Sequence, residues 1–396
     1  MTTSSTTHPD FETRVDLRRP ERLIASVPYL LGFTPADSLV LLVHASDGPE
    51  SHIVSHVMRV DIPDAAAVPE LAPTLDPALT GAAAVTVVLV GGDPPDDGPA
   101  HRDVMAALSA VMTDLGVPIN HALWTPEIRI GARWRCYADE SYADESCAGE
   151  LPDPAASTTA AVTTHAGQVT YASRDAMAHT LDPESDEALA RRAALLELAA
   201  CRDEAEPADV DDEIARAYAI VRDALERFRT GADAGTRPAL ADQEIVDLAR
   251  ALAHHEVRDA AFSVCWPPRS EVAVAAEHLW TALVRGVPPP ERAEPASLLA
   301  YTAYLRGDGP LAGMAVANAL EACPGHTLAK LFDQALVHAV PPEKLAGLAR
   351  DRRGALSAVA GRADDAGARA RGPGAGGGGT VSGAARNGGP ERSGPG

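Results

Sequence analysis

The chain has 396 residues, of which 46% are hydrophobic but only 4% aromatic, and its formal net charge is -22. An acidic protein repels nucleic-acid phosphates and anionic membrane surfaces, so binding to either is not expected. The length exceeds that of an ordinary single domain and favours two domains.

Residues 1–10 are polar, and we expect them to be disordered. Alternating apolar residues from Phe11 to Leu17 predict a short strand. The next segment predicts a helix that starts at Pro20, is shortened or kinked by Pro28, and ends at a Gly32 C-cap.

Apolar runs then predict strands that alternate with helices. Residues 38–44 and 52–60 flank a turn and predict a hairpin, and residues 83–90 form a continuous apolar run typical of a central strand. Helices are expected at 65–79 and 101–115, further strands near 119–124, 128–137 and 169–171, and an acidic irregular segment at 139–154. This order predicts an α/β (or α+β) domain with a mixed sheet over residues 11–172.

Residues 186–350 have helical periodicity throughout and predict an all-α domain. The expected helices are 186–203, 209–229, 240–254, 257–264, 270–285, 296–306, 309–322, 326–338 and 342–351. Leu298–Pro324 resembles a tetratricopeptide helical hairpin, but a single copy cannot form a solenoid, so we interpret it as a hairpin packed on its neighbours. Residues 357–396 are rich in Gly, Ala and Arg and are expected to form a disordered tail.

The five cysteines are widely spaced and none of them forms a Cys-x-x-Cys motif, so the sequence indicates neither a structural zinc nor a disulfide framework. No basic, apolar leader and no run of about 18 apolar residues is found, so we expect neither a signal peptide nor a transmembrane helix. A cytoplasmic location is the resulting expectation.

One polar cluster is a candidate binding site. Asp37 and Ser38 precede the first long strand and Asp61 ends the second, so antiparallel pairing would gather them with Pro35 at one sheet edge. A serine beside carboxylates suggests a nucleophile, but no histidine is placed to act as its base and no Gly-x-Ser-x-Gly elbow exists. A polar turn that caps backbone groups is the simpler interpretation, and we assign no catalytic residue.

Other patterns do not indicate a cofactor or a metal. His52 and His56 lie on one strand about 13 Å apart, too far to share a metal ion. The loop at Gly91 lacks the spacing of a phosphate-binding loop. Trp124 and Trp134, with arginines between them, could stack nucleic-acid bases, although protection of an edge strand is the simpler explanation.

The segment Leu23-Ile-Ala-Ser-Val-Pro-Tyr-Leu-Leu-Gly-Phe-Thr-Pro-Ala-Asp-Ser-Leu-Val40 closely resembles the opening signature of an actinobacterial domain-of-unknown-function family, numbered 4192. Further matching pieces are Arg59–Pro63, Gly131–Tyr137, Ser173–Asp175, Val257–Asp259 and Leu298–Pro324. The resemblance covers roughly residues 12–350. It implies an actinobacterial cytoplasmic protein but no activity, and therefore assigns no catalytic residue.

The leading hypothesis is a non-enzymatic protein-binding or scaffold module that contacts its partner through the helical domain. The alternative is a small-molecule enzyme or sensor with its site near Asp37 and Asp61. A DNA-associated role, which would depend on the arginines of the C-terminal tail, is the third possibility. The sequence does not decide whether the protein is an enzyme.

Overall fold

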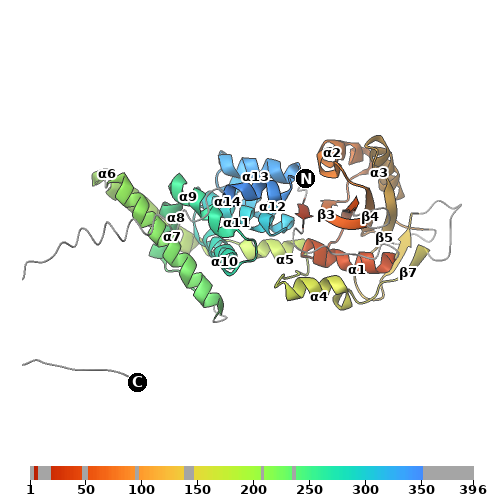
Figure 1. The fold of residues 1–396 in the computed structure, drawn as a ribbon, viewed down its shortest axis with the longest axis horizontal. Helices are drawn as coiled ribbons and strands as arrows, with labels where there is room; N and C mark the ends of the chain where they lie inside the picture. Colours follow the sequence, from red (N-terminus) through yellow and green to blue (C-terminus); the bar gives the residue numbers. More distant parts are fainter. Residues whose placement is uncertain are drawn as a thin grey trace, which may run out of the picture.

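The structure is a computed structural model and describes residues 4–7, 19–46, 52–93, 98–137, 147–206, 209–233 and 238–350. A mixed sheet with flanking helices occupies one end of the molecule, and the many helices of the C-terminal part occupy the other (Figure 1). The fold class predicted from the sequence is thereby confirmed. No helix in the described ranges is both long enough and apolar enough to span a membrane.

Within the described residues the sheet has seven strands, in the order β1-β3-β2-β4-β5-β6-β7. Their bounds are Ser4–Thr7 (β1), Ser38–Ser46 (β2), His52–Asp61 (β3), Ala84–Val90 (β4), Ile119–Thr125 (β5), Arg133–Cys136 (β6) and Ala148–Glu150 (β7). The neighbours β4 and β5 run parallel, and the other neighbouring pairs are antiparallel. The predicted hairpin and the predicted central strand are both present.

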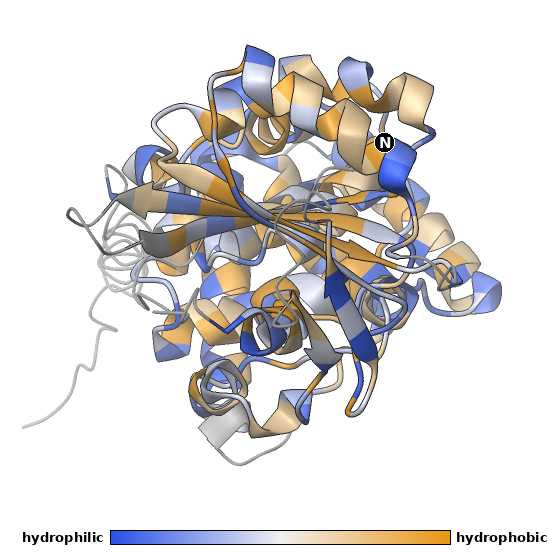
Figure 2. Cartoon of the chain, turned by 90° about the vertical axis from the view of Figure 1, so that its right-hand side faces the viewer, coloured by the Kyte–Doolittle hydropathy of each residue, from blue (hydrophilic) through white to orange (hydrophobic). Residues whose placement is uncertain are grey.

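β4 lies in the middle of the sheet because its side chains are apolar on both faces. All seven of its residues are buried, as in a strand that is covered on both sides. Val88 and Val90 contribute to the hydrophobic core on one face, whereas Val87 and Leu89 contribute to the core on the other. Coloured by hydropathy, the strands form an apolar layer with helices above and below it (Figure 2).

The helix α1 (Pro20–Leu31) covers one face of the sheet and continues past Pro28, so it does not have the early end that the sequence allowed there. Eight of its residues are buried, and this burial outweighs the one backbone hydrogen bond that a proline cannot donate. Gly32 ends the helix in the left-handed conformation, with φ 78°, as predicted.

The other face of the sheet is covered by η1 (Ala65–Leu71), α2 (Ala72–Leu79) and α3 (Arg102–Asp114). The predicted helix over 65–79 is divided into a 3-10 segment and an α-helix. Pro69 lies in the 3-10 segment, where short i→i+3 turns tolerate missing donors better than a long helix does.

The remaining helices follow the α/β region in chain order. They are α4 (Thr158–His165), α5 (Arg174–Ala178), α6 (Asp186–Ala205), α7 (Val210–Asp233), α8 (Asp242–Ala253), α9 (His255–Ala261), α10 (Glu271–Gly286), α11 (Ala293–Leu305), α12 (Gly309–Ala322), α13 (Thr327–Val337) and α14 (Pro342–Arg350), with 3-10 segments at η4 (Pro154–Ala156), η5 (His179–Leu181) and η6 (Phe262–Cys265). Each of the nine helices expected after residue 186 is present, whereas no helix was expected at α4.

The predicted helical hairpin consists of α11 and α12. Twelve of the thirteen α11 residues are buried, so this helix forms the centre of the helical region. Asp308 caps α12 by accepting a hydrogen bond from the backbone nitrogen of Leu311 at 3.0 Å. The likeness of this hairpin to a tetratricopeptide unit stays a prediction.

The two regions share one hydrophobic core. A single buried cluster contains Leu23 and Val88 from the α/β region and Trp280 and Tyr301 from the helical region. At the junction the backbone nitrogen of Tyr171 donates to the Gly32 carbonyl at 2.8 Å. Residues 169–171, predicted as a strand, form only an isolated bridge there.

Three other predictions differ from the structure. Ser4–Thr7 were expected to be disordered but pair with β3, because backbone hydrogen bonds along a sheet edge need no apolar side chains. The strand expected over 128–137 begins only at Arg133, since Gly131 turns the chain with φ 75°. The segment expected to be irregular at 139–154 contains β7 and the first residue of η4. The predicted strand at 11–17 and the tail at 357–396 lie outside the described residues.

Candidate functional site

The residues predicted to form a sheet-edge site lie together. Ser38 opens β2 directly opposite Asp61, the last residue of β3. The carbonyl of Asp37 accepts a hydrogen bond from the backbone nitrogen of Ile62 at 3.1 Å, and Pro35 is buried. Antiparallel pairing therefore gathers these residues as the sequence suggested.

The centre of this edge is Arg59, which was not among the predicted site residues. Its side chain is 7% exposed, and a terminal guanidinium nitrogen lies 2.6 Å from Asp61 Oδ1. Its Nε donates to Ser38 Oγ at 2.8 Å, and its Nη2 donates to the Ala36 carbonyl at 3.4 Å. Burial lowers the pKa of Arg59, and the charge of Asp61 opposes that effect. The positive charge is therefore neutralised within the edge itself.

Ser38 is not arranged as a nucleophile. Its Oγ donates a hydrogen bond to the Ala36 carbonyl at 2.6 Å and accepts one from Arg59. Its proton is thus held by a backbone oxygen rather than by a base, which agrees with the interpretation as a polar turn.

Gly91 packs against the same edge, where the lack of a side chain lets its backbone approach Asp37 closely. Its φ is 126°, and a Cβ atom there would lie 2.6 Å from Asp37 Oδ1 and 3.0 Å from Asp37 Cα. The indole nitrogen of Trp124 donates to the Gly91 carbonyl at 2.8 Å. Trp124 and Trp134 are both buried, so neither presents a face on which a base could stack.

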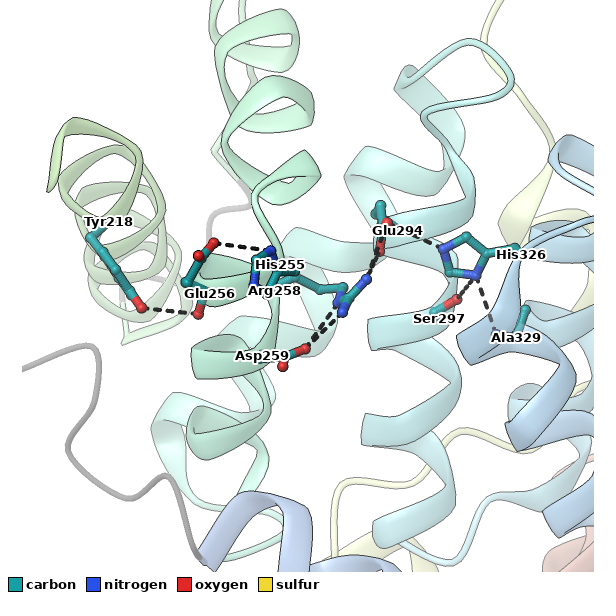
Figure 3. Close-up of polar contacts among 9 residues, drawn as sticks. All are labelled: Tyr218, His255, Glu256, Arg258, Asp259, Glu294, Ser297, His326 and Ala329. Carbon is teal, nitrogen blue, oxygen red and sulfur yellow. Dashed lines mark hydrogen bonds and ion pairs between the residues drawn. The ribbon is translucent and has the colours of Figure 1, made fainter. Parts of the chain in front are cut away.

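A second polar cluster links three helices of the helical region (Figure 3). On α9, Arg258 lies 2.9 Å from Asp259 Oδ1 and 3.4 Å from Glu294 Oε1, which belongs to α11. His326, before α13, places its Nε2 3.2 Å from the same Glu294 oxygen. Glu294 therefore bridges an arginine and a histidine that lie far apart in the sequence.

This cluster includes a serine, a histidine and a glutamate in contact, but the serine cannot react. His326 Nδ1 lies 3.3 Å from Ser297 Oγ and also accepts a hydrogen bond from the backbone nitrogen of Ala329 at 3.2 Å. Ser297 is fully buried and donates its own proton to the Ala293 carbonyl at 2.8 Å. A catalytic serine needs both access and a base that takes its proton, so the cluster caps α13 and holds the helices together.

The third site is a pocket of about 550 Å³ between the two regions, which we call the junction pocket. It is bounded by β2 and β3, by the turn between α2 and β4, and by the loop between α13 and α14. Its lining comprises Val43, Ala45, Ser55, His56, Pro77, Ala78, Thr80, Gly81, Ala82, His338, Ala339, Val340, Pro341 and Lys344. Its size is typical of sites for small ligands, which favour domain interfaces.

His56 lies on the sheet side of the junction pocket. Its Nδ1 is 3.1 Å from Ser55 Oγ, which donates a hydrogen bond to the Val43 carbonyl at 3.1 Å. Burial lowers the pKa of His56 to about 4, and a hydrogen bond with the Ala78 backbone opposes the shift. The imidazole is therefore neutral at pH 7 and adds hydrogen-bonding capacity rather than charge.

The positive charge on the helical side of the junction pocket comes from Lys344. Lys344 and His338 are exposed, and neither has an acidic partner within the described residues. The described lining holds no Asp or Glu, although such residues number 56 in the chain against 34 Lys and Arg. Lys344 is moreover one of only two lysines, the other being Lys330.

Across the ranges that the structure describes, no group of three or more His, Cys, Asp or Glu side chains converges as a metal site would require. His52 and His56 are on the same strand, and of this pair His56 lines the junction pocket.

A family model described as "Domain of unknown function (DUF4192)" matches residues 20–343. The match confirms the family resemblance predicted from the Leu23–Val40 signature. No curated protein and no solved structure matches the chain significantly.

Proposed function

We propose that this chain, which belongs to the DUF4192 family, binds a small organic anion in the junction pocket. The observation that carries the proposal is the position of Lys344. One of two lysines in a chain of net charge -22 borders a pocket whose described lining holds no carboxylate. A cation without a counter-ion in an otherwise acidic protein favours an anionic ligand.

The lining indicates the kind of anion. Most of the pocket wall is aliphatic, from residues such as Val43, Pro77 and Val340, and the polar groups are few. Sites of this composition bind ligands with an apolar body and use a small number of polar groups to orient them. An organic carboxylate or phosphate with a compact apolar body fits both properties.

The small-molecule site that we propose is the junction pocket and not the sheet edge at Asp37 and Asp61. At that edge Arg59 already has Asp61 as its counter-ion, so an incoming anion would have to displace a carboxylate. In the junction pocket Lys344 has no acidic partner among the described residues, so an incoming anion would displace no carboxylate from it.

The test measures the melting temperature of the full chain with phenylacetate, hexanoate and phenyl phosphate, each beside its neutral amide or alcohol. We expect at least one anion to raise the melting temperature by a few degrees while its neutral partner does not. Lys344→Met should weaken that anion's affinity about tenfold, which corresponds to about 1.4 kcal/mol. Lys330→Met is the matched control and should bind as the wild type does. Equal binding of neutral and charged probes, or equal behaviour of the two variants, would contradict the proposal.

A second proposal follows the leading hypothesis from the sequence, which is partner binding through the helical region. A groove of about 420 Å³ lies against α7 and is lined by Leu225, Val264 and Val272 with flanking charges from Arg222 and Glu226. Apolar floors with charged rims are typical of grooves that accept an amphipathic helix. An amphipathic helical segment of another protein is the partner that we propose.

Val272 and Val274 provide a matched pair for testing this groove. Both lie on α10 and are similarly exposed, at 40% and 37%, but only Val272 lines the groove. Val272→Glu should abolish the capture of helical partners from a cell extract, as measured by affinity purification and mass spectrometry. Val274→Glu should leave capture intact. Parallel loss or parallel retention in the two variants would exclude the groove as the binding surface.

A further inference from the structure

Two cysteine sulfurs lie unusually close together at the edge of the sheet away from β1. Cys147 Sγ is 2.7 Å from Cys136 Sγ, whereas a disulfide bond measures about 2.05 Å. Arg135 is paired with Ala148 across the antiparallel strands β6 and β7, so Cys136 and Cys147 are opposite one another in the continuing register.

That register suits a covalent bond. Directly opposed residues in an antiparallel pair have Cα atoms about 4.5–5.5 Å apart, within the range of about 4.4–6.8 Å that disulfides require. The sulfurs need to approach by less than about 1 Å, which side-chain rotation supplies without a change in the pairing of the strands.

We propose that Cys136 and Cys147 are a reversible modification site, at which a low-molecular-weight disulfide oxidises the two thiols to an intramolecular disulfide. The bond would fasten β7 to β6. Nothing in the junction pocket is needed for this step, so the proposal is independent of ligand binding.

The reaction takes place in two exchange steps. The Cys147 thiolate attacks one sulfur of the oxidant RSSR, which forms a Cys147–S–S–R mixed disulfide and releases RS⁻. The Cys136 sulfur then attacks Cys147 Sγ, which forms the Cys136–Cys147 bond and releases the second RS⁻. The two protein thiol protons pass to the two leaving thiolates, so two cysteines are oxidised and RSSR is reduced to two RSH.

The environment of Cys136 explains this order. Burial raises the pKa of Cys136 to about 12, and the neighbouring Cys147 thiol adds to the effect through its hydrogen bond and its charge. Cys136 therefore keeps its proton and is not the sulfur that attacks the oxidant. Once Cys147 is in a mixed disulfide, its sulfur carries no charge. The charge of Cys147 then no longer raises the pKa of Cys136.

The other cysteines differ in their surroundings and serve as controls. Cys201 is exposed on α6, whereas Cys265 is buried with its sulfur 3.1 Å from Thr302 Oγ1. Cys201 should react with a disulfide reagent but form only a mixed disulfide, since the sulfur contact among the described cysteines is between Cys136 and Cys147.

The experiment exposes the reduced full chain to oxidised glutathione, followed by thiol titration under denaturing conditions and peptide mapping. The Cys201→Ser variant should lose two titratable thiols from its remaining four, with a mass decrease of about 2 Da and a mapped 136–147 bond. Reduction with dithiothreitol should restore all four. The additional substitution Cys136→Ser should leave a stable glutathione adduct on Cys147, with no mass decrease.

Melting curves of the reduced variants establish that each is folded, and the oxidised Cys201→Ser protein should melt several degrees above its reduced form. A second double variant, Cys147→Ser with Cys201→Ser, should form no disulfide and show no such rise. A glutathione adduct on Cys147 that persists equally with and without Cys136 would overturn the proposal, and so would a mapped bond between other cysteines.

Discussion

Arg59 at the sheet edge and Lys344 in the junction pocket are both cationic, but their surroundings are opposite. Arg59 is buried, and its guanidinium contacts Ser38, Asp61 and a backbone carbonyl. Lys344 is exposed and has no acidic partner within the described residues. A charge whose contacts are complete contributes to stability, whereas one without a counter-ion is available to a ligand.

His326 and His56 also differ in their surroundings. His326 is held by Glu294 on one nitrogen and by the backbone of Ala329 on the other, so it is a structural cap. His56 lines the junction pocket beside Ser55 and is kept neutral by burial. The comparison of Arg59 with Lys344 predicts which substitution alters folding and which alters binding.

The largest effect is expected for Arg59→Met. This change removes the hydrogen bonds to Ser38 and Ala36 and the ion pair with Asp61, and should lower the free energy of unfolding by about 3 kcal/mol. Urea denaturation measures the loss. The control is Arg129→Met, which breaks an exposed pair with Glu127 and should cost under about 1 kcal/mol. Similar costs for the two variants would mean that Arg59 is not the centre of the edge.

Gly91→Ala should follow, with a cost of about 2–3 kcal/mol. The added Cβ would lie 2.6 Å from Asp37 Oδ1 in a backbone conformation, φ 126°, that L-residues rarely adopt. Gly116→Ala is the matched control, since its φ is also positive, at 70°, but no atom lies within 4 Å of the new Cβ. Its cost should stay near 1 kcal/mol, as chemical denaturation can determine. Equal costs would show that backbone strain alone, and not the contact with Asp37, fixes this glycine.

The sequence predicted those parts of the fold that local patterns determine. The run 83–90 is apolar on both faces and is the central strand, and each helical period after residue 186 corresponds to a helix. The helix α4 was missed because its short Thr- and Ala-rich sequence has no clear apolar face. A signal was present, however, in Ser157, whose Oγ caps the helix by accepting a hydrogen bond from Ala160.

The sites depended on contacts between distant residues, which local patterns do not specify. The proximity of Ser38 and Asp61 could be predicted from the sequence because a hairpin fixes their register. The role of Arg59 could not, because it depended on which face of β3 meets α1. The junction pocket joins His56 to Lys344 only after the helical region has docked on the sheet. Tertiary burial also explains why α1 does not end at Pro28, because that burial overrode the local preference of a proline.

The His56 imidazole should make the stability depend on pH. Its pKa is about 4 in the folded protein and 6.5 in the unfolded chain, so between these values the unfolded state binds more protons. Stability is therefore greatest above pH 6.5 and falls as the pH decreases below this value, by about 2 kcal/mol between pH 7 and pH 4.5. His56→Asn should remove this contribution, as urea denaturation at pH 7 and pH 4.5 would measure. The same loss of stability at pH 4.5 in His56→Asn and in the wild type would contradict this prediction.

The smallest effect on stability is expected for Lys344→Met, and it is the other half of the comparison. Because Lys344 has no ion pair in the described structure, its removal should change the free energy of unfolding by less than about 0.5 kcal/mol. Lys344→Met should instead weaken anion binding. Arg59→Met, if it is folded, should bind the anion as the wild type does. Isothermal titration measures the anion affinity of both variants, and urea denaturation measures their free energies of unfolding. A large loss of stability in Lys344→Met would make Lys344 a structural residue like Arg59, and the distinction between the two regions would fail.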